Sequence, residues 1–176
     1  ETDLFKELYE AYPTNVAFKN GLAISYSKLG ETHSALGNLE KALGFYEERS
    51  RLGQELYEAY ANNVAFKNGL AISYFNLGST HNKLGNVESA LSFFEKDLEV
   101  TKELYDAFPN NVEFKNNLAL SYKNMGERHE NAANPAAARE YFEQAAALWL
   151  QLVQSAPQFV EFKNNLEWVQ KKLAGQ

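Results

Sequence analysis

A strict internal repeat is the feature that most limits how this chain of 176 residues can fold. The segment Glu-Leu-Tyr-Glu-Ala-Tyr at 7–12 returns unchanged at 55–60. A constant offset of 48 residues separates four Phe-Lys-Asn triplets, which begin at Phe18, Phe66, Phe114 and Phe162. A constant period of this size predicts stacked supersecondary units, because a single unit cannot bury its apolar face alone.

Each period contains two amphipathic stripes with helical spacing. Apolar and aromatic residues recur at alternating steps of four and three, which places them on one side of a helix. The first stripe consists of Phe18, Leu22, Tyr26, Leu29, His33 and Leu36. The second consists of Leu39, Ala42, Tyr46, Gly53, Leu56 and Tyr60. The pattern therefore predicts an all-α fold in which each unit is a hairpin of two antiparallel helices.

Turn residues mark where these helices begin and end. Asn15, Asn63 and Asn111 are predicted N-caps of the first helix in each unit, since a side-chain oxygen there can accept bonds from the first turn. Gly37 and Gly85 are predicted to end that helix, where a left-handed residue is often needed. We call the first helix of a unit (about 15–36) the A helix and the second (about 38–60) the B helix.

These boundaries predict one continuous array over residues 1–176. Its predicted parts are a partial B helix at 1–12, hairpins at 15–60, 63–108 and 111–156, and a last A helix at 158–173.

The repeat resembles the tetratricopeptide repeat. The residues that carry the resemblance in the first unit are Tyr26, Leu29, Gly30, Gly37, Ala42 and Tyr46, and comparable residues recur in the next two units. The period is longer than the usual 34 residues of that family, and the stretch 116–122 is similar to the long hairpins of kinesin light chains. The resemblance implies a right-handed α-solenoid whose concave groove, lined by A helices, binds an extended peptide or a partner helix.

Family positions place ten residues in or near the expected peptide-binding groove: Asn20, Ser27, Asn68, Phe75, Asn82, Asn116, Asn117, Lys123, Asn164 and Lys171. Asparagine is a mediocre helix former, so its recurrence in the middle of every A helix suggests a role. Two hypotheses remain open. The asparagine amides could bond a peptide backbone, or they could bond neighbouring repeats and stabilise stacking.

Selectivity is expected where the repeats differ. Phe75 stands at the repeat position of Ser27 and Lys123, and an aromatic side chain in a groove is a candidate anchor. Lys123 and Lys171 occupy one position in consecutive units and could favour an acidic peptide or a C-terminal carboxylate.

Other recurring residues are expected to have structural roles. Gly30 and its repeats are expected to let the two helices of a hairpin approach closely. His33, His81 and His129 share one repeat position and are expected to pack in the core, because stacked helices lie too far apart for one metal ion. The carboxylates of the B helices show no paired arrangement in a pocket. We therefore expect no metal, no cofactor and no enzymatic activity.

Composition limits the classes of partner and the cellular compartment that we expect for this protein. The net charge of −6 argues against a nucleic-acid backbone or an anionic membrane as the main partner. The chain has no Cys, no apolar run of about 20 residues and no apolar start typical of a signal peptide, which favours a cytoplasmic protein.

Two functions fit this pattern. The first is a protein-binding or peptide-binding scaffold. The alternative is an architectural spacer or an array that associates with copies of itself through its repeat ends, whether engineered or the sensing arm of a larger signalling protein.

Overall fold

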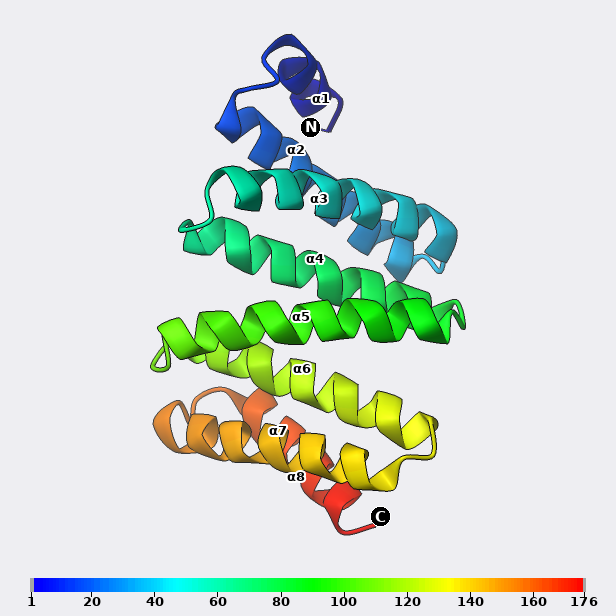
Figure 1. Ribbon diagram of the computed structural model, residues 1–176, viewed down its shortest axis with the longest axis vertical. Coiled ribbons are helices and arrows are strands. Elements are labelled where there is room, and N and C mark those ends of the chain that lie inside the picture. Colours follow the sequence, from blue (N-terminus) through cyan, green and yellow to red (C-terminus); the bar gives the residue numbers. More distant parts are fainter. Residues whose placement is uncertain (1, 176) are drawn as a thin grey trace. The chain divides into compact units, whose positions relative to one another are not determined.

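Helices account for nearly all of the described chain. The computed structural model describes residues 2–175 and contains, in that range, the helices α1 (Thr2–Ala11), α2 (Val16–Ala35), α3 (Leu39–Ala59), α4 (Val64–Lys83), α5 (Val87–Ala107), α6 (Val112–Asn131), α7 (Pro135–Ser155) and α8 (Val160–Leu173). Consecutive helices pack as antiparallel pairs, as in a tetratricopeptide solenoid, which confirms the predicted helical class (Figure 1). The predicted helix at 1–12 begins at Glu1, which lies outside the described residues.

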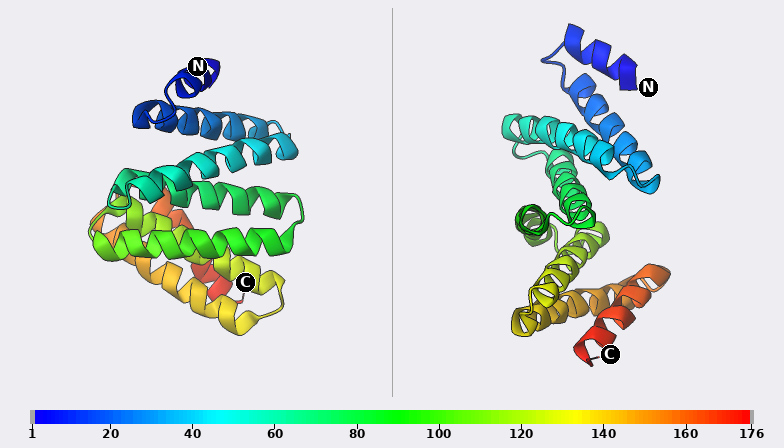
Figure 2. Two further views of the ribbon diagram at one scale, coloured as in Figure 1. Left: turned by 45° about the horizontal axis from the view of Figure 1, so that its top comes forward. Right: turned by 90° about the vertical axis from the view of Figure 1, so that its right-hand side faces the viewer.

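The chain divides into two compact units, Glu1–Lys96 and Asp97–Gln176, and the boundary falls within α5. In the first unit α1 packs on α2, α2 on α3 and α3 on α4. In the second unit α6 packs on α7 and α7 on α8. Figure 2 shows the α2–α3 hairpin and its turn from two further sides. The helices α2, α4, α6 and α8 are A helices, and α1, α3, α5 and α7 are B helices.

The predicted N-caps of the A helices are confirmed. The side-chain oxygen of Asn15 accepts a bond from the backbone N–H of Phe18 at 3.1 Å. Asn63 accepts from Ala65 and Phe66, and Asn111 accepts from Phe114. Each cap satisfies donors that the first helical turn would otherwise leave unpaired.

The central glycines of the A helices allow close approach, as predicted. A Cβ added at Gly30 would lie 2.5 Å from Cε1 of Tyr46, and one added at Gly126 would lie 2.5 Å from the same atom of Phe142. Both aromatic rings belong to the B helix of the same hairpin and are buried. The ring of the B helix therefore occupies the space that a side chain on the A helix would need.

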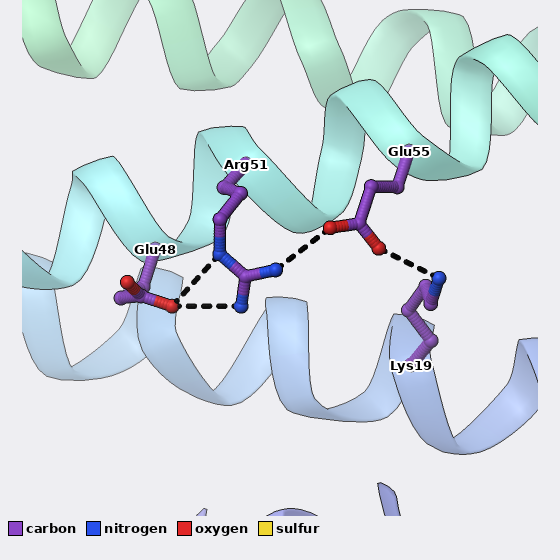
Figure 3. Close-up of polar contacts among 4 residues, drawn as sticks. All are labelled: Lys19, Glu48, Arg51 and Glu55. Atoms are coloured by element: carbon purple, nitrogen blue, oxygen red, sulfur yellow. Dashed lines mark hydrogen bonds and ion pairs between the residues drawn. The ribbon is translucent and has the colours of Figure 1, made fainter. Parts of the chain in front are cut away.

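An ion-pair network links the two helices of the first hairpin (Figure 3). The ammonium of Lys19 on α2 donates to Glu55 on α3 at 2.7 Å. Arg51 donates to the other oxygen of Glu55 at 2.7 Å and to Glu48 at 2.9 Å. The pKa of Glu55 is lowered, and the hydrogen bond from Lys19 is the largest cause. In the third hairpin, Lys115 donates in the same way to Gln151 at 3.1 Å.

The turns between A and B helices contain residues with left-handed backbone. Gly37 and Gly85 have φ angles of 76° and 78°, as expected for residues that end a helix. The third turn places Ala133 at this position with a φ of 53°. A side chain there crowds the following carbonyl, which costs about 1–2 kcal/mol.

We expect the substitution Gly30→Ala to lower the free energy of unfolding by about 1–2 kcal/mol. Overpacking against Tyr46 outweighs the gain of about 1 kcal/mol in helix propensity. Gly44→Ala in α3 is the matched control, because no atom lies within 4 Å of its added Cβ, and it should raise stability by about 1 kcal/mol. Urea unfolding followed by circular dichroism measures both, and equal effects of the two changes would contradict the packing role of Gly30.

We expect Ala133→Gly to raise the free energy of unfolding by about 1 kcal/mol, because glycine removes the strain at positive φ. Part of the gain is offset by the greater chain entropy of the unfolded glycine variant. Gly37→Ala should instead lower the free energy of unfolding. Thermal and urea denaturation of the two variants test this pair, and a loss of stability on Ala133→Gly would show that the turn is not strained.

Candidate functional site: the outer face of the A helices

Three repeat positions of each A helix form a stripe along one side of that helix. On α2 this stripe includes Asn20, Ile24 and Ser27, which follow one another at steps of four and three and so share one side of the helix. On α4 the same repeat positions are Asn68, Ile72 and Phe75, and on α6 they are Asn116, Leu120 and Lys123. We call these positions the A-face stripe.

Large apolar side chains lie exposed in the middle of this stripe. Ile24 is 44% exposed and Ile72 is 42% exposed, although both lie in the centre of a helix. The same repeat position carries Leu120 on α6 and Trp168 on α8, both half-buried. The sequence analysis missed this position, although a large apolar residue in all four A helices, outside the buried stripe, was a visible signal.

Consecutive A helices lie side by side within each unit. In the first unit, the ammonium of Lys83 at the end of α4 donates to the hydroxyl of Ser34 near the end of α2 at 3.3 Å. In the second unit, Lys172 of α8 donates to Glu130 of α6 at 2.7 Å. The stripes of neighbouring A helices therefore belong to one surface in each unit.

The predicted asparagines have different surroundings. The side-chain oxygen of Asn116 accepts a bond from the indole N–H of Trp149 on α7 at 2.9 Å, and Trp149 is fully buried. In the third hairpin the amide therefore joins the two helices of its own hairpin, which neither of the two hypotheses for the asparagines anticipated. Asn20 and Asn68 are half-buried, and Asn164 is exposed on α8.

The remaining predicted residues of the first three A helices are all partly buried. The ring of Phe75 packs edge-to-face on Phe94, with 6.5 Å between ring centres, so part of its surface is used within the first unit. Ser27 donates to Glu31 within α2 at 3.3 Å. Asn117 and Asn82 are half-buried, at the middle and near the end of their helices.

Two lysines and a tryptophan meet on the A helices of the second unit. The ammonium of Lys123 on α6 lies 4.4 Å from the ring centre of Trp168 on α8, and that of Lys172 lies 5.5 Å from it. Lys123 also pairs with Glu127 at 3.0 Å. The predicted partner of Lys123 was Lys171, which is exposed. Lys172 lies at this site instead, because it follows Trp168 by four positions and so shares its side of α8.

The three histidines lie on aromatic rings. His33 stacks on Phe45 with 5.3 Å between ring centres, His81 on Phe93 at 5.5 Å, and His129 on Tyr141 at 5.2 Å. Each ring pair joins the A helix to the B helix of its own hairpin. Within residues 2–175, no group of three or more metal-ligating side chains comes together.

One buried repeat position carries a different group in each hairpin, which the sequence analysis did not notice. On α3 it is Arg49, whose guanidinium donates to the carbonyl of Gly69 at 3.0 Å and fills the space that side chains at Gly53 and Gly69 would take. Burial lowers the pKa of Arg49. On α7 the position is Ala145, beside the large Trp149. The side chain that packs between adjacent helices at this position therefore differs from repeat to repeat.

On α5 this position is Asp97, which accepts a hydrogen bond from the hydroxyl of Ser121 on α6 at 2.6 Å. The hydroxyl of Thr101 lies 3.2 Å from the same Ser121 oxygen. Burial raises the pKa of Asp97 to about 7 from its usual 3.8, although the bond from Ser121 acts in the opposite direction. Asp97 is consequently protonated in the folded protein at pH values where the unfolded chain is ionised.

Two family models match the chain. Both are described as tetratricopeptide repeat, and they match residues 25–56 and 70–110. These two segments therefore match the repeat of tetratricopeptide repeat proteins. Both matches are shorter than the 48-residue offset, so the period and the kinesin-light-chain sub-family stay predictions. Such proteins typically mediate protein–protein interactions and are generally not enzymes. No curated protein matches the chain.

The chain was also compared with solved structures of repeat proteins. TTC0263, a thermophilic TPR protein of Thermus thermophilus, is 18% identical over 96% of this chain and 88% of its own, with a TM-score of 0.47. BtubC (BKLC) from P. vanneervenii is 17% identical over 99% of this chain and 80% of its own, with a TM-score of 0.48. At these values neither likeness indicates a function for this chain.

No helix in the described part of the chain is long and apolar enough to span a membrane.

We expect the stability of the protein to fall as the pH rises from about 4 to about 7. The folded state holds a proton on Asp97 that the unfolded chain has lost above its pKa of 3.8, so deprotonation favours unfolding in this window, by an amount on the order of a few kcal/mol. Asp97→Asn, which keeps an acceptor for Ser121, should remove the part of the pH dependence of the unfolding free energy that Asp97 causes. Urea unfolding at pH 5 and pH 8 measures it, and equal slopes in both proteins would show that Asp97 titrates normally.

Proposed function

We propose that this chain is a scaffold that binds an extended peptide or a helix of a partner protein on the outer face of its A helices. The observation that carries the proposal is the pair of exposed isoleucines, Ile24 and Ile72, at one repeat position on neighbouring helices. A single exposed apolar side chain is ordinary. Its recurrence at the same position on adjacent helices indicates a surface that is shielded when a ligand binds.

The neighbours of the isoleucines suit such a ligand. Phe75 lies one turn along α4 from Ile72 and is half-buried, which leaves part of its ring for a partner. The amide of Asn20 precedes Ile24 by one turn and can both donate and accept, as binding to a peptide backbone requires. We infer that the isoleucines and Phe75 provide apolar anchors, and that polar groups of the stripe set the direction of the bound segment.

The A helices of the second unit carry positive charge on their own surface. Lys123 and Lys172 place two ammonium groups on the face of Trp168, each also paired with a glutamate. An acidic side chain of a ligand could exchange with Glu127 or Glu130 at these ammonium groups. The predicted preference for an acidic peptide therefore rests on Lys123 and Lys172 rather than on Lys171.

A peptide-display selection on the purified protein tests the proposal. We expect enriched peptides to lose at least tenfold in affinity for the double variant Ile24→Ser, Ile72→Ser, because their apolar contacts are removed. Both positions are more than 40% exposed, so the fold should survive the changes, and circular dichroism checks that it does.

The matched control is the double variant Leu36→Ser, Val87→Ser. These residues are 68% and 61% exposed but lie at the C-terminal end of α2 and at the first residue of α5, away from the A-face stripe. Peptides that bind the control and the parent protein equally would support the proposal. Enrichment of no peptide, or equal binding to all three proteins, would overturn it.

A further inference from the structure

A buried arginine in the first unit has no counter-ion. Arg49 on α3 is 8% exposed, and its guanidinium donates to the backbone carbonyl of Gly69 on α4 at 3.0 Å. No carboxylate among the described residues pairs with Arg49, and its other N–H groups have no described acceptor. A charge that is removed from water in this way is costly unless an opposite charge meets it.

The later repeats carry no such unbalanced charge at this position. Asp97 accepts a hydrogen bond from Ser121, and burial raises its pKa to about 7, so the carboxyl is neutral below that pH. Ala145 has no polar side chain. For Arg49, burial lowers the pKa and no described carboxylate opposes this effect. A guanidinium nevertheless stays protonated in proteins, so Arg49 is a cation held inside the first unit without neutralisation.

Two glycines leave room beside this guanidinium. A Cβ added at Gly53 would lie 2.7 Å from Nη1 of Arg49, and one added at Gly69 would lie 2.5 Å from Nη2. The next repeat carries the larger residues Thr101 and Asn117 at these two positions. Gly69 is half-buried, so the guanidinium comes near the surface at a point where α4 has no side chain to cover it. A small anionic group could approach Arg49 there.

A purely structural role does not explain the charge of Arg49. The carbonyl of Gly69 also accepts a bond from the hydroxyl of Ser73 at 2.8 Å, so it does not depend on the arginine for a partner. An apolar side chain of similar length would fill the same space between α3 and α4 without the cost of a buried charge.

We propose that Arg49 is a binding site for a ligand carboxylate, which is either a C-terminal carboxylate or that of an acidic side chain. The planar guanidinium matches a carboxylate through parallel N–H···O bonds, which an ammonium group does not. The bond to Gly69 already holds the side chain in place, so little rotamer freedom is lost on binding. The low dielectric around a buried group strengthens the pair.

This site goes beyond the proposed function. Arg49 lies on a B helix, whereas the peptide surface proposed above consists of side chains of the A helices. Gly69 directly follows Asn68 of the A-face stripe along α4. A free carboxylate can therefore occupy the site whether or not a peptide is bound on the stripe.

Nuclear magnetic resonance of the arginine side chains tests the proposal on the unmodified protein. Sodium acetate should shift the Nε–Hε resonance of Arg49 in a saturable manner, with sodium chloride at equal ionic strength as the reference. Acetamide, which has a similar shape and no charge, should leave the resonance in place. The absence of a saturable shift with acetate, or an equal shift with acetamide, would overturn the proposal.

Two arginines on one helix allow a matched comparison of variants. Arg49→Met should abolish the rise in Tm that acetate causes in the wild-type protein. Arg51→Met is the control and should keep this rise, because Arg51 is exposed and already pairs with Glu48 and Glu55 (Figure 3). Without acetate, Arg49→Met should be at least as stable as the wild type, since it removes an unpaired buried charge. A less stable Arg49→Met that still responds to acetate would show that Arg49 only joins the helices.

Arg49→Lys separates the effect of charge from that of shape. The variant keeps a positive charge but should bind acetate about tenfold more weakly, because an ammonium group lacks the planar fork. Equal affinity of the variant and the wild type would contradict recognition by the guanidinium.

Two further probes distinguish the sources of the carboxylate. Acetyl-isoleucine presents a C-terminal carboxylate, and the C-terminal amide of acetyl-aspartate presents the carboxylate of a side chain. Binding of either probe, measured on the Arg49 resonance, supports the proposal, and the tighter one identifies the source. Binding of neither would overturn it. No selected peptide is used, so these outcomes are independent of the proposed function on the A-face stripe.

Discussion

Close approach of the two helices in each hairpin is the constraint on which the rest of this structure depends. A glycine in the centre of the A helix leaves room for a buried aromatic ring of the B helix, Tyr46 in the first hairpin and Phe142 in the third. The ring fixes the distance between the helices, and the stacked histidine and aromatic pairs fix their rotation. With one face of the A helix used in this way, the opposite face is left to solvent or to a partner.

The contacts between successive hairpins vary more from repeat to repeat than the contacts within each hairpin. One buried position carries Arg49, Asp97 or Ala145, and each choice is matched by its neighbours: two glycines beside the arginine, hydroxyl groups beside the aspartate, and a tryptophan beside the alanine. Since interiors are closely packed, a change at one of these positions requires a compensating change nearby. Repeats that look almost interchangeable along the sequence are therefore distinct at their contacts. Burial at this position raises the pKa of Asp97 to about 7, so we expect stability to depend on pH between about 4 and 7.

Exposed apolar surface recurs at one position of the A helices in the first unit. The isoleucines at 24 and 72 are exposed although the opposite side of each helix is packed. Packing within the repeat therefore does not require these two side chains, and this is why we propose the surface around them as the binding site for a partner protein.

The sequence by itself determined the helices and the N-caps of the first three A helices, because the repeat, the apolar spacing and the turn residues all act locally. Asn15 caps its helix and Gly30 admits Tyr46 for reasons visible in the spacing alone. Only the tertiary structure decided which polar groups meet. Asn116 accepts a bond from Trp149 on the other helix of its hairpin, which neither hypothesis for the asparagines anticipated, and Lys172 rather than Lys171 lies with Lys123 on Trp168. Such contacts depend on how one helix is rotated against the next. The repeat length in the sequence does not specify that rotation.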